Sequence, residues 1–250
     1  MKYENRISEI DGLKTKIDAE RPLSLNALKQ LKEYYRIGLT YSSNAIEGNS
    51  LTETETKIVI EDGITVGGKP LKDHYEAMGH SEAFSFLYDL AKNSEITEDD
   101  VLRLHHLFYY RVDEKEAGKY RNVNVLITGS SYIPPSHAEV PALMKKFTGS
   151  IASMRKKYHP VEFSARLHKE LVAIHPFVDG NGRTARLLMN LALLQTGYVV
   201  TIIPPILRND YIDAIKKAQS HEKDDKPFIN FISAMVYESA KEYIRLTGSL

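Results

Sequence analysis

The sequence predicts a mainly α-helical fold that carries one β-hairpin, and three observations lead to this class. Apolar residues recur at helical spacing over most of the chain. Residues 183–197 read RTARLLMNLALLQTG, which is apolar on nearly every side, as expected for a helix at the centre of a bundle. Residues 122–136 combine β-branched residues with a Gly-Ser-Ser turn, and this is the one convincing strand signal.

The predicted helices begin at recognisable signals. In the first third of the chain, Leu13, Ile17 and Leu28 keep helical spacing. Thr52 is followed three residues later by Glu55, which is the pattern of a capping box, so a helix should begin there.

The same reading extends through the second half. Pro160 suits the first turn of a helix, and its apolar stripe continues through Phe163, Leu167 and Leu171. Gly197 is expected to end the central helix.

Residues 122–136, NVNVLITGSSYIPPS, are predicted to form the hairpin. The β-branched residues come first, then Gly-Ser-Ser, then Tyr-Ile before two prolines. Because an isolated hairpin is only marginally stable in water, this one should lie over another part of the fold.

Length and composition limit the classes of protein. With 250 residues and 42% apolar content, the chain suits one large domain or two small ones. We place the boundary between an N-terminal helical region, residues 1–95, and a core domain, residues 96–250. The 33 basic and 33 acidic residues balance, so nucleic acid and a membrane surface are not expected partners. The absence of Cys excludes disulfides, thiolate metal sites and a cysteine nucleophile.

The sequence shows neither a membrane-spanning stretch nor a secretory signal. No apolar run approaches the roughly 20 residues that a spanning helix requires. The start, MKYENRISEIDGLKTKIDAE, lacks a basic cap followed by an apolar run. We therefore expect a soluble, cytoplasmic protein.

Residues 175–186, HPFVDGNGRTAR, place a polar loop between two predicted helices. Amides of the Gly-Asn-Gly run at 180–182 can form a concave nest of N–H groups, and the start of the second helix adds free donors. Arg183 and Arg186, three apart, share one face of that helix. The loop is therefore predicted to bind an anion, and two arginines beside a nest suit a di- or triphosphate.

Two further residues of this loop carry chemistry. Asp179 offers a hard oxygen ligand, which suits Mg²⁺ bridging phosphate oxygens. His175 can take up a proton near neutral pH, as a general base must. Each feature also has a simpler interpretation, because His-Pro often ends a helix, Asp-Gly often forms a turn and two arginines often share a solvated face. Their combination in one loop favours the functional interpretation.

HPFVDGNGRTAR matches, at every fixed position, the signature H-P-F-x-D/E-G-N-G/K-R-x-x-R of the Fic family. The stretches AGKYRNVNV, HPVEF and RNDYIDAIKKA also resemble the Fic core, so the resemblance extends from about Tyr41 to Tyr243. On these motifs the chain is identified as a member of the family, similar to its AMP-transferring enzymes, including the metazoan one. Doc-type relatives, which phosphorylate, typically carry Lys at the position of Gly182, which argues against that reaction here.

The resemblance implies a reaction and a fold. His175 would deprotonate a Ser, Thr or Tyr hydroxyl of a target protein, the oxygen would attack the α-phosphorus of ATP, and pyrophosphate would leave. The fold would be a Fic-type helical core with the hairpin, residues 122–136, as a flap over the active site. The target protein would dock on this flap by adding its backbone as a strand.

The resemblance also assigns roles by position. Asp179 would hold Mg²⁺ on the α and β phosphates of ATP, while Arg183 and Arg186 would bind the β and γ phosphates. Tyr211 would lie against the adenosine, and Phe177 would anchor the loop in the core. Three residues of the loop would cradle the phosphates, namely Gly180, Asn181 and Gly182.

The stretch YSSNAIEGNS, residues 41–50, resembles the inhibitory motif S/T-x-x-x-E-G/N of the same family, with Ser43, Glu47 and Gly48 at its fixed positions. The simpler interpretation is a helix end with Gly48 just beyond it. In the inhibitory interpretation, Glu47 pairs bidentately with Arg186 and occupies the guanidinium that the γ-phosphate needs. In relatives of this arrangement the same glutamate orients a water that hydrolyses the AMP–protein bond.

Other functions stay open at this point. The first alternative is a nucleotide-binding regulatory module with negligible catalysis, although such a module would not need His175. The second is a Fic enzyme that acts mainly by removing AMP from its target. A homodimer is also left open.

Overall fold

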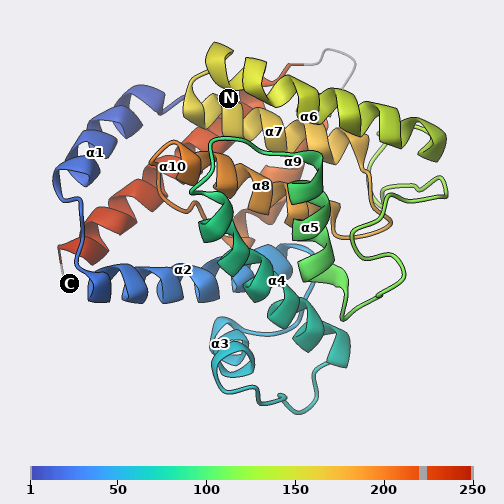
Figure 1. Ribbon diagram of the computed structural model, residues 1–250, viewed down its shortest axis with the longest axis horizontal. Coiled ribbons are helices and arrows are strands. Elements are labelled where there is room, and N and C mark those ends of the chain that lie inside the picture. The colour runs from blue at the N-terminus through green and yellow to red at the C-terminus, as the bar shows by residue number, and fades with distance from the viewer. Residues whose placement is uncertain (1, 220–223, 249–250) are drawn as a thin grey trace.

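The computed structural model describes residues 2–219 and 224–248, and their regular structure is helical (Figure 1). The α-helices are α1 (Ile7–Ala19), α2 (Leu25–Ile46), α3 (Glu53–Glu61), α4 (Leu71–Leu90), α5 (Glu98–Tyr109), α6 (Val140–Lys157), α7 (Pro160–Ile174), α8 (Asn181–Gln195), α9 (Arg208–Gln219) and α10 (Lys226–Thr247). Two short 3₁₀ helices, η1 (His137–Glu139) and η2 (Pro205–Leu207), precede α6 and α9. The prediction of a mainly α-helical protein is confirmed over the described residues.

Helix α8 occupies the centre of the molecule (Figure 1). It packs most extensively against α7, and α4, α5 and α2 contact its other sides. Ala185, Leu187, Leu188 and Leu191 have no exposed surface, as the sequence predicted for this helix. Gly197, with a φ of +79°, follows its end, because this left-handed conformation suits glycine.

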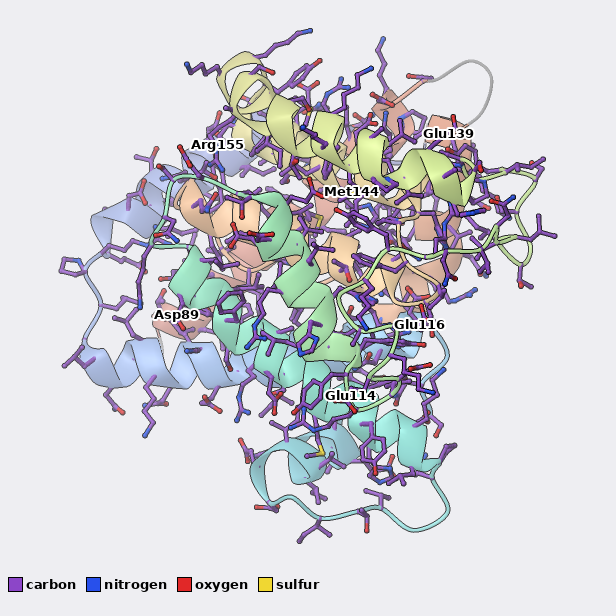
Figure 2. All side chains as sticks on the ribbon, turned by 45° about the vertical axis from the view of Figure 1, so that its right-hand side comes forward. Asp89, Glu114, Glu116, Glu139, Met144 and Arg155 are labelled. Carbon is purple, nitrogen blue, oxygen red and sulfur yellow. The ribbon has the colours of Figure 1, made fainter. Side chains whose placement is uncertain are left out.

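Two hydrophobic clusters stabilise the bundle. The larger draws its side chains mainly from α2, α4, α5, α6, α7 and α8, and the smaller from α1, α7, α8, α9 and α10. Figure 2 shows Glu139 and Arg155 toward the two ends of α6, with Met144 between them. Met144 is fully buried, and burying a side chain of this size contributes roughly 1.5–3 kcal/mol.

Local capping fixes where α2 and α3 begin. The Ser24 hydroxyl accepts a hydrogen bond from the Ala27 amide (3.1 Å) and caps α2. At α3, Thr52 Oγ1 accepts from the Glu55 amide (3.2 Å), and Glu55 Oε2 accepts from the Thr52 amide (2.7 Å). The predicted capping box is therefore present. Helix α2 runs unbroken to Ile46 and brings its C-terminal end to α8.

The structure corrects the prediction of a β-hairpin over residues 122–136. This segment is described throughout and contains no strand. The guanidinium of Arg121 donates to the carbonyls of Val123 (2.9 Å) and Pro135 (2.5 Å), so these acceptors pair with a side chain rather than with a facing strand. The two prolines, Pro134 and Pro135, have no N–H to donate to a ladder. The segment is an extended loop, which we call the 122–136 loop.

The lengths and apolar content of the described helices can be compared with what a membrane-spanning helix requires. Within residues 2–219 and 224–248, no helix is both long enough and apolar enough to cross a membrane.

Candidate active site

Residues 175–180 form the loop between α7 and α8, as the sequence predicted. His175 caps α7 in the left-handed conformation, with φ 53° and ψ 58°, which is uncommon for a residue with a Cβ. Gly180 caps α8 with φ 79°, and a Cβ at this position would lie 2.7 Å from the Phe108 ring. Conformation and space both therefore require glycine at 180.

Buried side chains brace this loop from two sides. Asn181 donates to the Phe177 carbonyl (2.8 Å) and accepts from the Phe177 amide (2.9 Å), so it closes the turn on itself. The ring of Phe177 stacks on His105, with centroids 3.7 Å apart and planes 1° from parallel. His105 Nδ1 accepts from the Gly118 amide (2.9 Å), which leaves Nε2–H to donate to the Asp179 carbonyl (3.1 Å). Phe177 thus anchors the loop as expected.

The start of α8 is the predicted anion site. The first intrahelical amide bond runs from Thr184 N to the Gly180 carbonyl (2.9 Å). The amides of residues 181–183 precede it and have no carbonyl within the helix to donate to. They lie at the positive end of the helix dipole, which favours an anion. Of the Gly-Asn-Gly run, Gly180 alone has a positive φ, so the site is a helix N-terminus rather than a nest of alternating φ.

His175 lies beside this N-terminus with its backbone fixed by Arg121. Arg121 Nε donates to the His175 carbonyl (2.8 Å), and the Arg121 amide donates to the Pro176 carbonyl (2.9 Å). Burial lowers the pKa of His175, and the nearby backbone carbonyl of Val172 acts in the opposite direction. The imidazole is therefore mainly neutral at neutral pH, which is the form that accepts a proton.

Arg183 is held by Glu76, a glutamate on helix α4. Its Nη1 lies 2.8 Å from Glu76 Oε1 on α4, and its Nη2 lies 3.2 Å from Asp179 Oδ1. The guanidinium also lies over the Phe108 ring, 4.3 Å from the centroid. The side chains of Arg183 and Glu76 are 3% and 6% exposed, so this pair is removed from water.

Asp179 is half-exposed and already surrounded by positive groups. Its Oδ1 accepts from the Gly180 amide (2.6 Å), and its Oδ2 lies 3.6 Å from Lys72 Nζ. Burial tends to raise the pKa of Asp179, but Arg183, the amide and Lys72 hold it below its usual value. Among the described residues, no cluster of three or more His, Cys, Asp or Glu side chains could hold a metal ion. A cation here would need oxygen atoms from another molecule, such as phosphates.

Arg186 is 1% exposed and has a full set of protein partners. Nε donates to the Ser43 hydroxyl (2.9 Å), and Nη2 donates to the Ser43 carbonyl (2.8 Å). Nη2 also lies 2.8 Å from Glu47 Oε1, and Nη1 donates to the Tyr211 hydroxyl (3.1 Å). The predicted pairing of Glu47 with Arg186 is present, although through one carboxylate oxygen rather than two.

Glu47 is the residue that caps the C-terminal end of α2. Gly48 follows with φ +97°, so the helix-end interpretation of this motif also holds. Although burial tends to raise the pKa of Glu47, Arg186 and Arg183 hold it below its usual value, so the carboxylate is ionised. A Cβ on Gly182 would collide with Glu47 Oε1, which means that Glu47 lies directly against the start of α8.

Tyr211 is buried on α9, at 1% exposed. Its hydroxyl accepts from Arg186 and lies 2.8 Å from His168 Nε2. Its ring packs against Phe228 and Phe231. The hydroxyl therefore fixes the guanidinium of Arg186 in place.

A cavity of about 580 Å³ lies beside this site, and Asp179, Arg183 and Arg186 are not among the residues that line it. Its walls come from the loop before α8, from α9, from the end of α2 and from the tip of the 122–136 loop. The size suits a small-molecule site, for which roughly 300–1,000 Å³ is typical. Predicted site residues that line it are Glu47, His175, Gly182 and Tyr211.

Sequence reasoning missed three residues that position the site. Arg121 fixes the loop backbone, Glu76 holds Arg183, and His105 supports Phe177. Arg121 lies in the stretch AGKYRNVNV, so a signal for it was present. Glu76 and His105 are ordinary members of helical patterns, and their partners lie far away in the sequence.

Comparison with known proteins agrees with this geometry. The fold and site define a class: helical proteins with a glycine-containing loop before a buried helix, and an arginine within that helix that pairs with a carboxylate. The Fic/DOC family description matches residues 95–193, which include the whole loop. The chain is 34% identical to the protein adenylyltransferase Fic of Drosophila willistoni over 249 residues, and 34% identical to that of Nematostella vectensis over 244 residues.

The coverage is uneven between this chain and those relatives. The two alignments take in 99% and 96% of this chain but 49% and 56% of the relatives. The chain thus spans about half the length of the curated relatives it matches. Among solved structures, a fragment of Fic-1 from C. elegans has a TM-score of 0.87 at 29% identity, covering 97% of this chain and 72% of that one.

A Fic domain containing signaling protein from Bacteroides thetaiotaomicron is equally similar in structure. Its TM-score is 0.87 at 28% identity, and the match covers 96% of this chain and 97% of that one. These matches place residues 95–193 of this chain in the Fic/DOC family.

Proposed function

We propose that this protein transfers AMP from ATP to a hydroxyl group of a target protein, and that Glu47 restrains this activity. The observation that carries the proposal is the convergence of the partly buried His175 imidazole, the start of α8 at Gly182 and the carboxylate of Glu47 on one cavity, with the buried Arg186 paired to that carboxylate. The relatives that match 96–99% of this chain are named protein adenylyltransferases.

The transfer step follows from the placement of His175. Its neutral ring takes the proton of a Ser, Thr or Tyr hydroxyl of the target. The hydroxyl oxygen forms a bond to the α-phosphorus of ATP, and the bond between that phosphorus and the α,β-bridging oxygen breaks. AMP is then esterified to the target, the proton is on His175, and pyrophosphate leaves.

The triphosphate would be bound by the start of α8. The free amides of Asn181, Gly182 and Arg183 face the end of the helix where an anion is favoured. Gly180 lets the chain enter the helix at this point, and the guanidinium groups of Arg183 and Arg186 would bind the outer phosphates. Tyr211 lines the cavity, where its ring would lie beside the adenosine.

The donor set near α8 also fits Mg²⁺ bound together with ATP. Asp179 is ionised, half-exposed and beside the amides of α8, and a hard carboxylate oxygen is the ligand type that Mg²⁺ prefers. Phosphate oxygens would complete its coordination. When bound, the ion would neutralise charge on the phosphates, while Lys72 would give way to it.

Glu47 would restrain the reaction by occupying Arg186. With Ser43, Tyr211 and Glu47 all bound to it, this guanidinium has no free fork for a γ-phosphate. ATP would then bind with its phosphates misplaced for in-line attack. The N-terminal region, residues 1–95, would in this account be the regulatory part of the chain. The same carboxylate lies close enough to the cavity to orient a water for removal of AMP.

The 122–136 loop would dock the target protein. Residues 127–130 at its tip line the cavity that contains His175. Leu126 and Ile133 are 85% and 75% exposed, so the loop presents apolar side chains that a partner could cover. A target segment could pair with the free backbone of this loop, and pairing would bring its hydroxyl to His175.

The proposal is tested with ATP labelled at the α-phosphate and, in parallel, at the γ-phosphate. Glu47→Gly should place α-label on protein, either on itself or on proteins of a cell extract, and should place no γ-label. Glu47→Gly/His175→Ala should lose the label. Glu114→Gly, at an exposed glutamate marked in Figure 2, is the matched control and should behave as the wild type. Protein labelling from the γ-phosphate would indicate phosphorylation instead, and binding of ATP without any labelling would favour a regulatory module.

A further inference from the structure

A second cavity lies against the N-terminal half of α2, away from the active site. Its volume is about 420 Å³, and its walls come from α2, α4, α10, the residues after α8 and the turn before α2. It shares no lining residue with the cavity around His175. Its size is within the range of small-molecule sites.

Aliphatic side chains line much of this cavity. Leu28 and Leu31 come from α2, Leu194 comes from α8, and Val199 and Val200 follow that helix. Such a surface is stabilised by contact with hydrocarbon rather than with water. The cavity therefore suits the apolar part of a ligand.

Three tyrosines of the cavity lining have hydroxyl groups that donate to no other described residue. Tyr35 is 4% exposed, and its buried hydroxyl has no hydrogen-bond partner among the described residues. The hydroxyls of Tyr88 and Tyr243, which also line the cavity, bond to no other described group. Burial raises the pKa of Tyr35 and of Tyr88, so both remain protonated donors. A buried hydroxyl normally has a partner, so the Tyr35 hydroxyl is the donor at this cavity that a ligand would satisfy.

Lys32 supplies a positive charge at the same place. Its Nζ lies 4.9 Å from the centroid of the Tyr88 ring, and within the described ranges it has no ion-pair partner. Asp89, seen near the end of α4 in Figure 2, pairs with Lys92 at 2.8 Å, and the charge of Lys32 acts on Asp89 without an ion-pair contact. Arg21, the other cation of the lining, donates to the Gly197 carbonyl (2.7 Å). Lys32 is thus the ammonium group that can receive an anion here.

We propose that this cavity binds a medium-chain aliphatic carboxylate. The hydrocarbon chain would lie against the leucines and valines, and the carboxylate would accept hydrogen bonds from Lys32 and from the Tyr35 hydroxyl. One available ammonium group matches a single negative charge. The phenol rings of Tyr88 and Tyr243 would contact the ligand where its hydrocarbon chain joins the carboxylate.

Isothermal titration calorimetry with decanoate, kept below its micelle concentration, tests the proposal on the full chain. The wild type should bind one decanoate saturably. Lys32→Met should weaken binding about tenfold, since it removes the charge and keeps the aliphatic stem. Tyr35→Phe should weaken it about threefold or more, since it removes the hydroxyl alone. Lys29→Met and Tyr34→Phe, on the same helix but outside the cavity lining, are the matched controls and should bind as the wild type.

A ligand of opposite charge and a cavity-filling variant provide two further tests. Decylammonium, with the same chain and the opposite charge, should not bind. If Tyr35→Phe fails to fold, Ala91→Leu, which fills the cavity, should abolish decanoate binding. Absence of saturable binding to the wild type, equal binding of decylammonium, or decanoate affinity unchanged by both Lys32→Met and a cavity variant would overturn it.

Discussion

Two arginine–carboxylate pairs stand beside each other at the start of α8, and they differ in how firmly each is held. Arg183 pairs with Glu76, which projects from the middle of α4 and is 6% exposed. Glu76 also accepts from Asn49 (3.0 Å). Arg186 pairs with Glu47, which caps the last turn of α2 and is 35% exposed. Both guanidinium groups are buried. Arg183 pairs with a glutamate in the middle of a helix, whereas Arg186 pairs with a glutamate at a helix end.

The difference indicates which pair can be exchanged for a substrate. Removing Glu76 would leave Arg183 with the partly exposed Asp179 and the Phe108 ring. Removing Glu47 would leave Arg186 still bound to both Ser43 groups and to Tyr211. We infer that Arg183 keeps its pairing with Glu76 when ATP binds, and that the pairing of Arg186 with Glu47 is the one that a phosphate displaces.

The largest expected effect separates the two pairs by stability. Glu76→Ala should lower the free energy of unfolding by about 3 kcal/mol, because it leaves a buried charge short of its main partner. Glu47→Ala should lower it by about 1 kcal/mol or less, because Arg186 keeps its other acceptors. Urea denaturation followed by circular dichroism measures both. Equal losses would contradict the distinction between the pairs.

A smaller effect should reveal the contact between Glu47 and α8. Gly182→Ala places a Cβ against Glu47 Oε1, so it should destabilise the wild type by about 1–3 kcal/mol. In the Glu47→Gly background the nearest remaining group is Arg186 Nη1, 3.2 Å from the added Cβ, so the same change should destabilise the protein much less. The coupling energy from this double-mutant cycle is the measurement. Additive effects of the two substitutions would show that the side chains do not touch.

The smallest expected effect is a dependence on pH. The pKa of His175 is lowered by burial, so the transfer rate of Glu47→Gly should fall in acid with a midpoint below the ordinary histidine value of 6.5. Measuring that rate against pH tests this, and a midpoint above 6.5 would contradict it.

The pKa of Glu47 is also lowered in the folded state. Its stabilising contribution is therefore present above the ordinary glutamate range and is lost as pH falls through the lowered pKa. The stability difference between the wild type and Glu47→Gln should therefore vanish in acid. A difference that grows toward low pH would contradict the pairing with Arg186.

Much of the helical fold was predictable because local signals and burial agreed. The capping box at Thr52 is present, and the apolar residues of 183–197 form the central helix. The hairpin was wrong because its β-branched sequence is local, whereas its conformation depends on Arg121, whose guanidinium takes the carbonyls of Val123 and Pro135. A sequence pattern does not show such a competing donor.

The candidate site also contains some features that the sequence predicted and others that it did not. The loop, its arginines and the pairing of Glu47 with Arg186 were predicted, because a long motif and its resemblance to a family carry them. The role of Asn181 as a brace of the turn, and the pairing of Glu76 with Arg183, were not predicted. These depend on tertiary contacts between groups with no distinctive spacing.

The central claim is that Glu47 occupies the guanidinium that the γ-phosphate needs. Isothermal titration calorimetry of ATP and ADP with Mg²⁺ tests it directly, on the wild type, Glu47→Gly and the isosteric Glu47→Gln. The wild type should bind ATP and ADP with similar affinity, because Arg186 cannot reach the additional phosphate. Glu47→Gly should bind ATP about tenfold more tightly than the wild type does, with ADP little changed. The same ratio of ATP to ADP affinity in the wild type and in Glu47→Gly would contradict the account.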